Sequence, residues 1–518
     1  MLKFNKLFFY IIIFLILFTG IFLSFNVGIT HDELHEQLNW DFNKIIFKNL
    51  ISGNNEIVPY IDKYYGIGFN FISQPIQYFV LQLYDFNNVS TFGSKLILKH
   101  PVVFLFYFIS SLFFYKILKK ITNDKKFSII SMFFYLLYPY LLGHSFFNSK
   151  DIPFLSIWLI CSYLSCYIFE KFATKNFVSL KKIIILALTT AFLLSIRISG
   201  ILIFLQYFFT LIIFLSYFKN TANYIYLSKR IILFLVFCLL FTILFYPVFW
   251  KNPLEIINAV KFMSHHYNDI CTLTFGKCLK SLQLDSTYIF SWLIVKLPII
   301  IIIGLLLLPL TEKKIFFNDI NKLYFGTILL SIVIIPLILI FNKVPLYDEI
   351  RQVLFLVPLY LIIGLISLYY FLKKKSYLII IAFIFLFLFE NIKLYPYQYV
   401  WLNYPTRFFE IEKNFELDYW GLSGKKIAHT LKNLNTDNLC VIVSPEHSVK
   451  PFLVNEKYDC YLPWGVIQTD IKRPFYAIQL GRNLRSSLPY KCSYSHQEKL
   501  KLPFYKGNLI LGNLIKCN

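Results

Sequence analysis

The most regular feature of the sequence is a series of long apolar blocks separated by short polar segments. Each block is close to the ~20 residues that an α-helix needs to cross a bilayer. The first is too long for the apolar part of a signal peptide and has no small-residue cleavage site after it, so we expect a retained anchor. The pattern predicts about eleven spans, at residues 7–28, 99–118, 127–146, 152–170, 182–198, 200–218, 231–249, 288–310, 322–342, 353–371 and 376–391.

The pattern changes after residue 391, where the apolar blocks shorten and Pro, Gly and polar residues return. LCVIVSP, RPFYAIQL and GNLILGNL have the length and composition of short strands, and GLSGKKIAHTLKNLN has the periodicity of an amphipathic helix. The sequence therefore predicts an α-helical polytopic membrane protein in two parts. Residues 1–391 form the membrane body, and residues 392–518 form a small α/β domain.

Composition agrees with a membrane protein, since 57% of the residues are hydrophobic and only 15% are charged. The net charge of +23 does not indicate nucleic-acid binding, because the basic residues cluster in short links on alternate sides of successive spans. The positive-inside rule then predicts a cytoplasmic N-terminus and a C-terminal domain outside.

Two of the predicted outer loops are long, at residues 29–98 and 250–287. Both contain amphipathic stretches, FNFISQPIQYFVLQLY and WKNPLEIINAVKFMSHHYND, which we expect to lie as helices at the membrane interface. Six of the nine cysteines fall in predicted outer segments, two in the second loop and four in the tail. They could form disulfides within these groups in an oxidising compartment, and the lack of CxxC spacing argues against structural zinc.

The segment THDELHE, directly after the first span, gathers acids and imidazoles at the membrane edge. In a helix, Asp32 and Glu36 share one face, and so do His31 and His35. Low dielectric would raise the pKa of Asp32, which suits a general base. An acidic cap at a helix N-terminus explains the segment equally well. The histidine pair could bind a divalent metal, although its order differs from the zincin motif; no other cofactor is expected.

Three further clusters carry charge at the predicted outer edge. Lys150 and Asp151 sit in a tight turn, where the alternative is a surface ion pair. Arg197 lies within an apolar stretch, where the alternative is a side chain that snorkels to the interface. Two later loops add residues that could hold a lipid phosphate: His265, His266, Lys343, Tyr347, Asp348 and Arg351.

These positions suit a substrate whose reactive carbon lies just above a phosphate at the membrane surface. A sugar on a polyprenyl phosphate has that form. Asp32 would take the proton of an acceptor hydroxyl, the hydroxyl oxygen would attack the anomeric carbon, and the cations would stabilise the departing phosphate.

Several motifs, in order, resemble the GT-C superfamily of membrane glycosyltransferases. They are THDE, FNSKDIPF, RISG, YPVFWKNP, LYDEIRQVLF, YPYQYVWLN and DYWG. Within that superfamily the chain resembles the bacterial glycosyltransferase family 39-like proteins, so we expect a bacterial cytoplasmic membrane. These proteins are related to protein O-mannosyltransferases and to the aminoarabinose transferases that modify lipid A. The resemblance implies inverting transfer from a polyprenyl-phosphate sugar on the non-cytoplasmic face.

The resemblance also implies roles for single residues. Asp32 matches the catalytic aspartate, with Glu33 beside it, and Asp151 matches the acid of the second loop. Arg351 matches a basic residue of the later loop, with Tyr347 and Asp348 beside it, and Arg197 matches an arginine at similar depth. Gln352 stands where many relatives have histidine, so a role for that position is in doubt.

Two other functions stay open on the sequence alone. One is a transporter or flippase of lipid-linked sugars, which should carry charges near the bilayer midplane in repeated halves. The other is a non-enzymatic membrane scaffold for envelope assembly. The sequence does not identify the sugar, or whether the acceptor is a glycan, a lipid or a protein.

Overall fold

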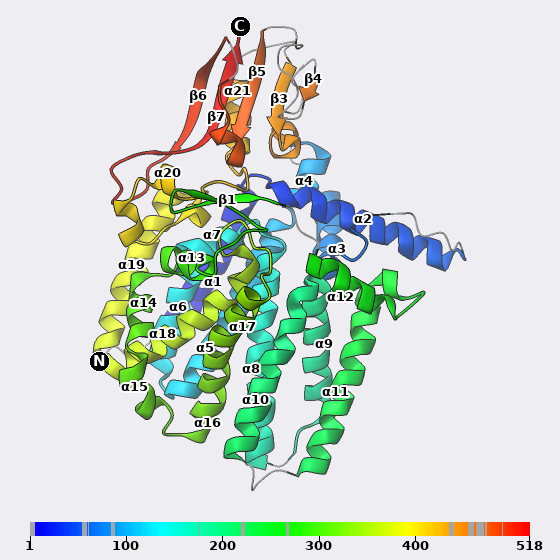
Figure 1. Ribbon diagram of the computed structural model, residues 1–518, viewed down its shortest axis with the longest axis vertical. Coiled ribbons are helices and arrows are strands. Elements are labelled where there is room, and N and C mark those ends of the chain that lie inside the picture. Colours follow the sequence, from blue (N-terminus) through cyan, green and yellow to red (C-terminus); the bar gives the residue numbers. More distant parts are fainter. Residues whose placement is uncertain are drawn as a thin grey trace.

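The computed structural model describes residues 6–53, 60, 62–83, 89–175, 177–218, 223–265, 269–434, 440–453, 460–462, 471, 474–488 and 491–518. A bundle of helices forms the body, and a smaller β-sheet domain stands on one end of it (Figure 1). Each of the eleven predicted blocks is occupied by helix. The helices of the bundle are α1 (Lys6–Phe25), α5 (His100–Thr122), α6 (Lys125–Leu137), α7 (Pro139–Ser145), α8 (Asp151–Lys175), α9 (Leu180–Ile196), α10 (Ile203–Tyr217), α11 (Tyr224–Phe245), α13 (Tyr288–Lys296), α14 (Ile299–Leu306), α15 (Leu308–Ile315), α16 (Asp319–Asn321), α17 (Thr327–Phe341), α18 (Val357–Leu372) and α19 (Lys375–Leu394).

Within the described residues, seven helices are long and apolar enough to cross a membrane, or nine if each of two bent pairs is one span. The chain is thus an integral, multi-pass membrane protein. The two remaining predicted spans fall on α1 and α9, which have 20 and 17 residues. The bent pairs are α6–α7, at 61°, and α13–α14, at 119°. Each bend has a proline, Pro139 or Pro298, preceded by a residue in extended conformation, because proline disfavours helical backbone before it.

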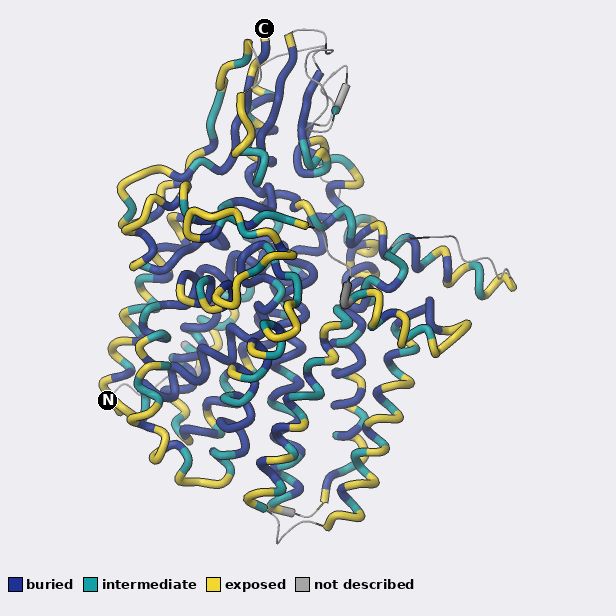
Figure 2. The backbone as a smooth tube through the Cα atoms, in the orientation of Figure 1, coloured by how far each residue is buried: buried dark blue, intermediate teal, exposed yellow. Residues whose placement is uncertain are grey.

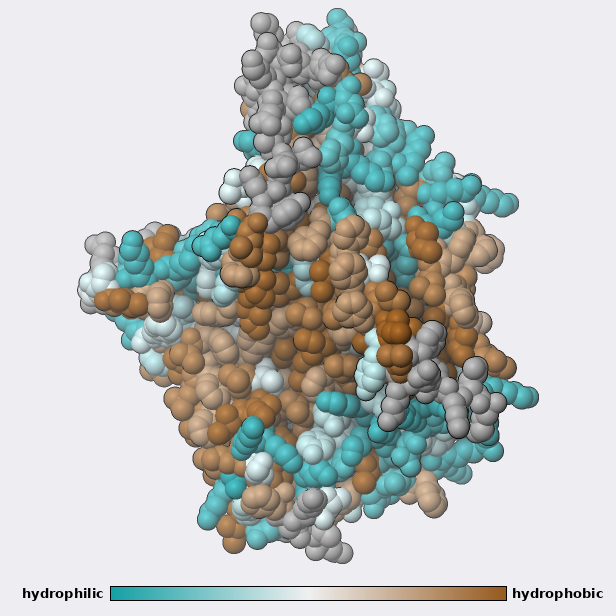
Figure 3. All heavy atoms as spheres, turned by 180° about the vertical axis from the view of Figure 1, so that it is seen from behind, coloured by the Kyte–Doolittle hydropathy of each residue, from teal (hydrophilic) through white to brown (hydrophobic). Residues whose placement is uncertain are grey.

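The outer surface of the bundle carries a broad apolar band between two polar ends (Figure 3). The helices at its centre are hidden from this surface: 89% of the most apolar window of the α18 span is buried, against 22% for α11 (Figure 2). Two glycines allow α14 to pack tightly on α18. A Cβ on Gly304 would lie 2.2 Å from the carbonyl oxygen of Gly364, so the backbones touch there.

The loops predicted to lie outside gather at the end of the bundle that carries the β-sheet domain (Figure 1). The two predicted interfacial stretches are helical, as α3 (Gly68–Leu83) and α12 (Glu255–His265). Helix α2 (His31–Ile51) runs across the end of the bundle, and α4 (Thr91–Ile97) follows it. A small hairpin of β1 (Cys271–Thr274) and β2 (Lys277–Lys280) is closed by a disulfide between Cys271 and Cys278.

The C-terminal domain is built on a mixed five-stranded sheet of order β4-β3-β5-β7-β6. The predicted strands and helix are all present, and the shorter α20 precedes them. Strand β3 is parallel to β4 and β5, whereas β7 is antiparallel to both β5 and β6. The elements are α20 (Ile411–Asn414), α21 (Gly424–Lys432), β3 (Cys440–Ser444), β4 (Cys460–Leu462), β5 (Phe475–Leu480), β6 (Cys492–Leu500) and β7 (Leu509–Cys517).

One face of this sheet joins the domain to the body. Ile427 of α21 and Ile478 of β5 share a buried apolar cluster with Ile29 and Leu96, which come from the segments around α2 and α4. A disulfide between Cys492 and Cys517 ties the edge strand β6 to β7. The domain is therefore packed against the residues that lead into α2, where the predicted site begins.

Candidate active site

A cavity of about 500 Å³ opens at the end of the bundle below the start of α2. Segments far apart in the chain supply its walls: the start of α2, the link before α3, the starts of α8 and η1 (Ile198–Leu202), and the loop that leads into η5 (Arg351–Leu356). Its polar lining includes seven residues that the sequence singled out: His31, Asp32, His35, Lys150, Arg197, Tyr347 and Arg351.

Asp32 is presented by the first turn of α2. Thr30 caps this helix, and its backbone nitrogen and hydroxyl both donate to Glu33 Oε1, at 2.7 and 2.8 Å. The carboxylate of Asp32 lies 2.8 Å from Arg351 Nη2 across the cavity, and its side chain is 29% exposed. A general base in this position can therefore meet a substrate.

The electrostatic surroundings of Asp32 differ from those expected. Burial acts to raise the pKa of this carboxyl, as predicted, but Arg351, His31 and His35 act against it and together hold the pKa below its usual value. The prediction of a raised pKa is wrong, because the sequence did not show that a guanidinium would lie against the carboxylate. Asp32 is ionised in this state.

Arg351 is surrounded by aromatic and acidic side chains. Its guanidinium lies 4.5 Å from the ring centre of Trp420 and 5.3 Å from that of Tyr347, and its Nη1 is 3.3 Å from Asp348 Oδ2. The side chain is only 5% exposed, so its one open direction is the cavity.

Lys150 and Asp151 are neighbours in sequence but serve different partners. Lys150 Nζ lies 3.2 Å from Glu36 Oε1, donates to the carbonyl of Gly66 at 2.8 Å and stands 3.9 Å from the ring centre of Tyr65. Burial lowers the pKa of this lysine, against the attraction of Glu36.

Asp151 turns the other way, away from the cavity lining. It forms an ion pair with Arg197, whose Nη1 lies at 2.5 Å, and it accepts from Asn148 Nδ2 at 3.0 Å. Its effect on the cavity is therefore through Arg197, which it holds against the wall. Three cations, Lys150, Arg197 and Arg351, thus face one hollow, each with an acid behind or beside it.

In the loop before η5, the backbone conformation directs the neighbouring side chains of Asp348 and Glu349 to different partners. Asp348 and Glu349 both adopt left-handed φ, +57° and +65°, which non-glycine residues rarely do. Asp348 forms ion pairs with Arg351 and with Arg482 of the C-terminal domain. Glu349 turns inward to Lys296 Nζ, at 2.8 Å, and burial raises its pKa to about 7.

Other predicted site residues lie outside this cavity. Glu33 does not line it: besides Thr30 it contacts His100 Nε2 at 2.9 Å, so its carboxylate is used in the helix cap and the core. Lys343 is exposed on the turn after α17. His265 ends α12, but its side chain and all of His266 lie outside the described residues.

The predicted histidine pair does not assemble into a metal centre with other ligands. His35 Nε2 lies 3.7 Å from Asp62 Oδ2, and in the described part of the chain no three His, Cys, Asp or Glu side chains are placed to hold a metal ion. His31 instead serves through its backbone, since its carbonyl lies 2.9 Å from Nε2 of His447.

The C-terminal domain contributes contacts that the sequence did not predict. His447 touches the carbonyls of both Thr30 and His31, and the His31 nitrogen donates to the carbonyl of Trp420 at 3.0 Å. Arg482 reaches Asp348 from the other side. The only advance signal was the DYWG motif, which contains Trp420. The domain thus clamps the start of α2 and extends an alternating chain of charges from Arg482 through Asp348 and Arg351 to Asp32.

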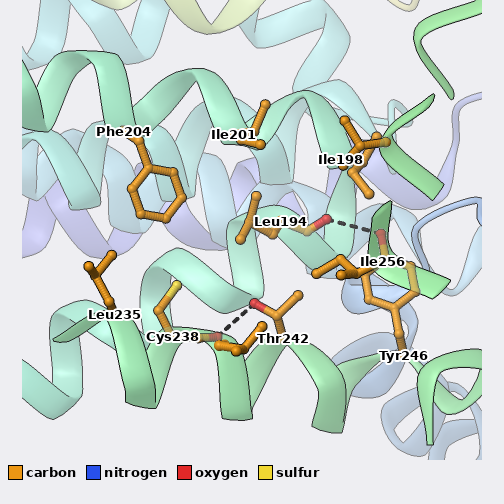
Figure 4. A pocket seen from close by; sticks show the side chains of 11 residues that line it. Leu194, Ile198, Ile201, Phe204, Leu235, Cys238, Thr242, Tyr246 and Ile256 are labelled. Carbon is orange, nitrogen blue, oxygen red and sulfur yellow. Dashed lines mark hydrogen bonds between the residues drawn. The ribbon is translucent and has the colours of Figure 1, made fainter. Parts of the chain in front are cut away.

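An apolar cavity of about 230 Å³ adjoins the polar one and shares Ile198 with it. Its walls come from α9, η1, α10, α11 and α12 (Figure 4). The polar groups among them are bonded to backbone: Thr242 donates to the Cys238 carbonyl at 2.7 Å, and Tyr246 donates to the Leu194 carbonyl at 3.0 Å. A second apolar cavity, also about 230 Å³, shares Phe204 and Leu235 with the first. Both apolar cavities lie among the apolar parts of the helices.

No protein-family model matches the sequence, and no curated protein matches it significantly. The structure is similar to the crystal structure of ArnT from Cupriavidus metallidurans in the apo state, with a TM-score of 0.50 and 10% identity over 98% of this chain and 97% of that one. The crystal structure of ArnT from the same organism bound to undecaprenyl phosphate aligns with a TM-score of 0.49 and 10% identity over 98% of each chain. The match in the apo state shows an ArnT-like fold, and the structure confirms the predicted polytopic helical body with a small C-terminal domain.

Proposed function

We propose that this protein is an inverting glycosyltransferase that moves a sugar from a polyprenyl-phosphate donor to an acceptor hydroxyl at the outer membrane face. One observation carries the proposal: a carboxylate, Asp32, and three cations, Lys150, Arg197 and Arg351, line the same cavity, and an apolar cavity adjoins it among the helices. A carboxylate alone would suit many reactions. The combination with cations and an apolar path suits a lipid-linked phosphate ester. The GT-C-like fold of ArnT supports the same class of reaction by analogy.

The donor would bind by its two unlike ends. The polyprenyl chain would occupy the apolar cavities, whose polar groups are already bonded, and the phosphate would lie among the cations of the polar cavity. Arginine and lysine form their strongest hydrogen bonds with such anions. The sugar would then project toward α2, with its anomeric carbon between the phosphate and Asp32.

The chemical step needs one base and one leaving group. The acceptor oxygen attacks the anomeric carbon from the face opposite the phosphate, and its proton passes to the carboxylate of Asp32. The bond between the anomeric carbon and the phosphate oxygen breaks, and the electron pair leaves with polyprenyl phosphate. Arg351, Arg197 and Lys150 stabilise the charge that develops there.

The pairing of Asp32 with Arg351 links donor binding to basicity. In the free protein Arg351 holds the carboxylate ionised, which makes it a weak base. A donor phosphate would compete for the same guanidinium. As Arg351 turns toward the phosphate, Asp32 loses its cation and its affinity for a proton rises. The base would thus become effective when the donor is in place.

A transporter or flippase is the main alternative. Its polar groups should lie near the middle of the spans, whereas the cluster described above lies at the end of the bundle beside the β-sheet domain (Figure 1). A scaffold would leave the cavity residues replaceable without chemical consequence.

Asp32→Asn distinguishes these functions, with Asp41→Asn as the matched control. Asp41 lies on the same helix but is 40% exposed and pairs with Lys44 at the surface. Mass spectrometry of the cell's glycolipids, glycans and glycoproteins, with and without the gene, would first identify the acceptor class. We expect Asp32→Asn to abolish the modification at normal membrane abundance and Asp41→Asn to keep it. Full modification with Asp32→Asn would remove this carboxylate from the mechanism.

A further inference from the structure

The opposite end of the bundle carries a second polar hollow, of about 660 Å³, which the proposed reaction does not use. It lies between α5, α8, α16 and the end of α18, at the end of the bundle that the positive-inside rule predicts to face the cytosol. Lysine, tyrosine and asparagine supply most of its lining: Lys116, Lys119, Lys120, Tyr115, Tyr163, Tyr370, Asn123, Asn318 and Asn321.

Aromatic rings hold the lysines of this hollow in place. Lys116 Nζ lies 4.4 Å from the ring centre of Phe113 and 5.4 Å from that of Tyr163, and Lys119 Nζ lies 6.0 Å from that of Tyr115. Such contacts restrict long side chains that would otherwise move freely in water. Their ammonium groups are therefore partly ordered before any ligand binds.

More positive charge surrounds the neighbouring ring of Tyr167, which stacks on Tyr163 at 5.7 Å. Lys120, Lys171 and Lys182 stand over Tyr167 at 5.9, 5.3 and 5.0 Å. Four lysines from α5, α8 and α9 thus converge on one pair of tyrosines. A solvated basic loop would satisfy the topology rule without this arrangement.

The nearby acids neutralise only part of the cluster. Glu170 is 5% exposed and is occupied by Lys120 Nζ, at 2.6 Å, and by the hydroxyl of Tyr324, at 2.7 Å. Asp319 pairs with Lys322 at 2.7 Å. Lys116 and Lys119 have no acidic partner among the described residues, so the hollow has a strong net positive charge.

An apolar strip leads from the lipid-facing surface to these lysines. Ile109, Leu112, Lys116 and Lys119 follow one face of α5 at helical spacing, and Ile109 and Leu112 are 39% and 40% exposed. An acyl chain could follow this strip while its headgroup reached the hollow. A soluble anion has no acyl chain that could contact this strip.

We propose that this hollow binds the phosphate of an anionic phospholipid in the leaflet at this end of the bundle. The lysine ammonium groups and the asparagine amides supply donors to the phosphate oxygens, and the α5 strip receives a tail. The site is independent of the glycosyl transfer proposed above.

The test uses the full-length protein in detergent, with Lys116→Gln/Lys119→Gln as the variant and Lys313→Gln/Lys314→Gln as the matched control. The control pair is exposed on α15, at the same end of the bundle, and does not line the hollow. Native mass spectrometry would measure the affinity for phosphatidylglycerol, for phosphatidylcholine and for inorganic phosphate.

We expect wild-type and control protein to retain phosphatidylglycerol in preference to phosphatidylcholine. A lysine near an anionic surface contributes roughly fivefold to affinity, so the variant should bind about 30-fold more weakly. All three proteins should unfold at the same temperature without anionic lipid, because the replaced side chains are exposed. Equal retention by variant and control, no preference for phosphatidylglycerol, or equally tight binding of inorganic phosphate would each overturn the proposal.

Discussion

Asp32→Asn should strengthen binding of polyprenyl phosphate, the lipid product of the proposed reaction, while it removes transfer. The reason is the contact at 2.8 Å between Asp32 and Arg351, because lipid phosphate would compete with this carboxylate for the guanidinium. Removing the acid frees Arg351 and also removes a negative charge from the cavity that receives the phosphate. Most catalytic-residue substitutions leave product binding unchanged or weaken it.

The size of the effect follows from the exposure of the pair. A fully exposed ion pair contributes about 0–1 kcal/mol, whereas breaking a buried one costs about 3–5 kcal/mol. Asp32 is 29% exposed and Arg351 is 5% exposed, so the pair lies between these limits. We therefore expect Asp32→Asn to improve the binding free energy of polyprenyl phosphate by about 1–2 kcal/mol, which corresponds to roughly 5-fold to 30-fold tighter binding.

Native mass spectrometry or thermophoresis with purified protein and undecaprenyl phosphate would measure the change. Asp41→Asn is the control, since it removes the same charge from an exposed position on the same helix. Arg351→Gln provides the opposite sign, because it removes a donor that the phosphate needs. Equal or weaker binding by Asp32→Asn would refute the competition between carboxylate and phosphate.

Three further outcomes test the site and its supports. Arg351→Gln should raise the pKa of Asp32, because burial acts to raise this pKa and the arginine acts to lower it. On acidification, the residual transfer of the variant should therefore decline at a higher pH than that of the wild type. Coinciding pH profiles would contradict this expectation. Glu33→Gln should lower the free energy of unfolding by about 1 kcal/mol, and with it the melting temperature, because it weakens the cap of α2. The variant should keep most of its transfer activity. Loss of transfer in a stable, folded variant would restore the catalytic role predicted for Glu33. Replacing Cys492 and Cys517 with serine should lower the free energy of unfolding by about 3 kcal/mol, measured by thermal unfolding, since the disulfide closes a loop over a sequence separation of 25. An unchanged melting temperature would show that this bond does not stabilise the domain.

The architecture of the body could be predicted because it depends on local pattern. A helix must satisfy its own backbone in lipid, so a run of apolar residues of the right length is nearly sufficient. The same applies to strands β3, β5 and β7, whose apolar runs are short and end at polar or turn residues. The count of spans was less certain, since proline bends α6–α7 and α13–α14 and since α9 has only 17 residues.

The candidate site divides in the same way. Asp32, Lys150, Arg197 and Arg351 could be selected from the sequence, because charge at the edge of an apolar block is costly and therefore conspicuous. The ion-pair partners of these residues could not be identified from the sequence. Asp32 meets Arg351 across 319 positions, and Lys150 meets Glu36 across 114.

By itself the sequence determined which segments form long apolar helices, which strands build the C-terminal domain and which charges stand at the ends of the apolar blocks. Only the tertiary structure decided how those charges are paired: that Arg351 holds Asp32 ionised, that Glu33 caps a helix, and that Arg482 and His447 reach the site from the C-terminal domain. The physical reason is the distance along the chain over which each interaction acts. Hydrophobic burial acts on each segment separately, whereas an ion pair has no counterpart in local sequence and forms only when packing brings two distant side chains within a few ångströms.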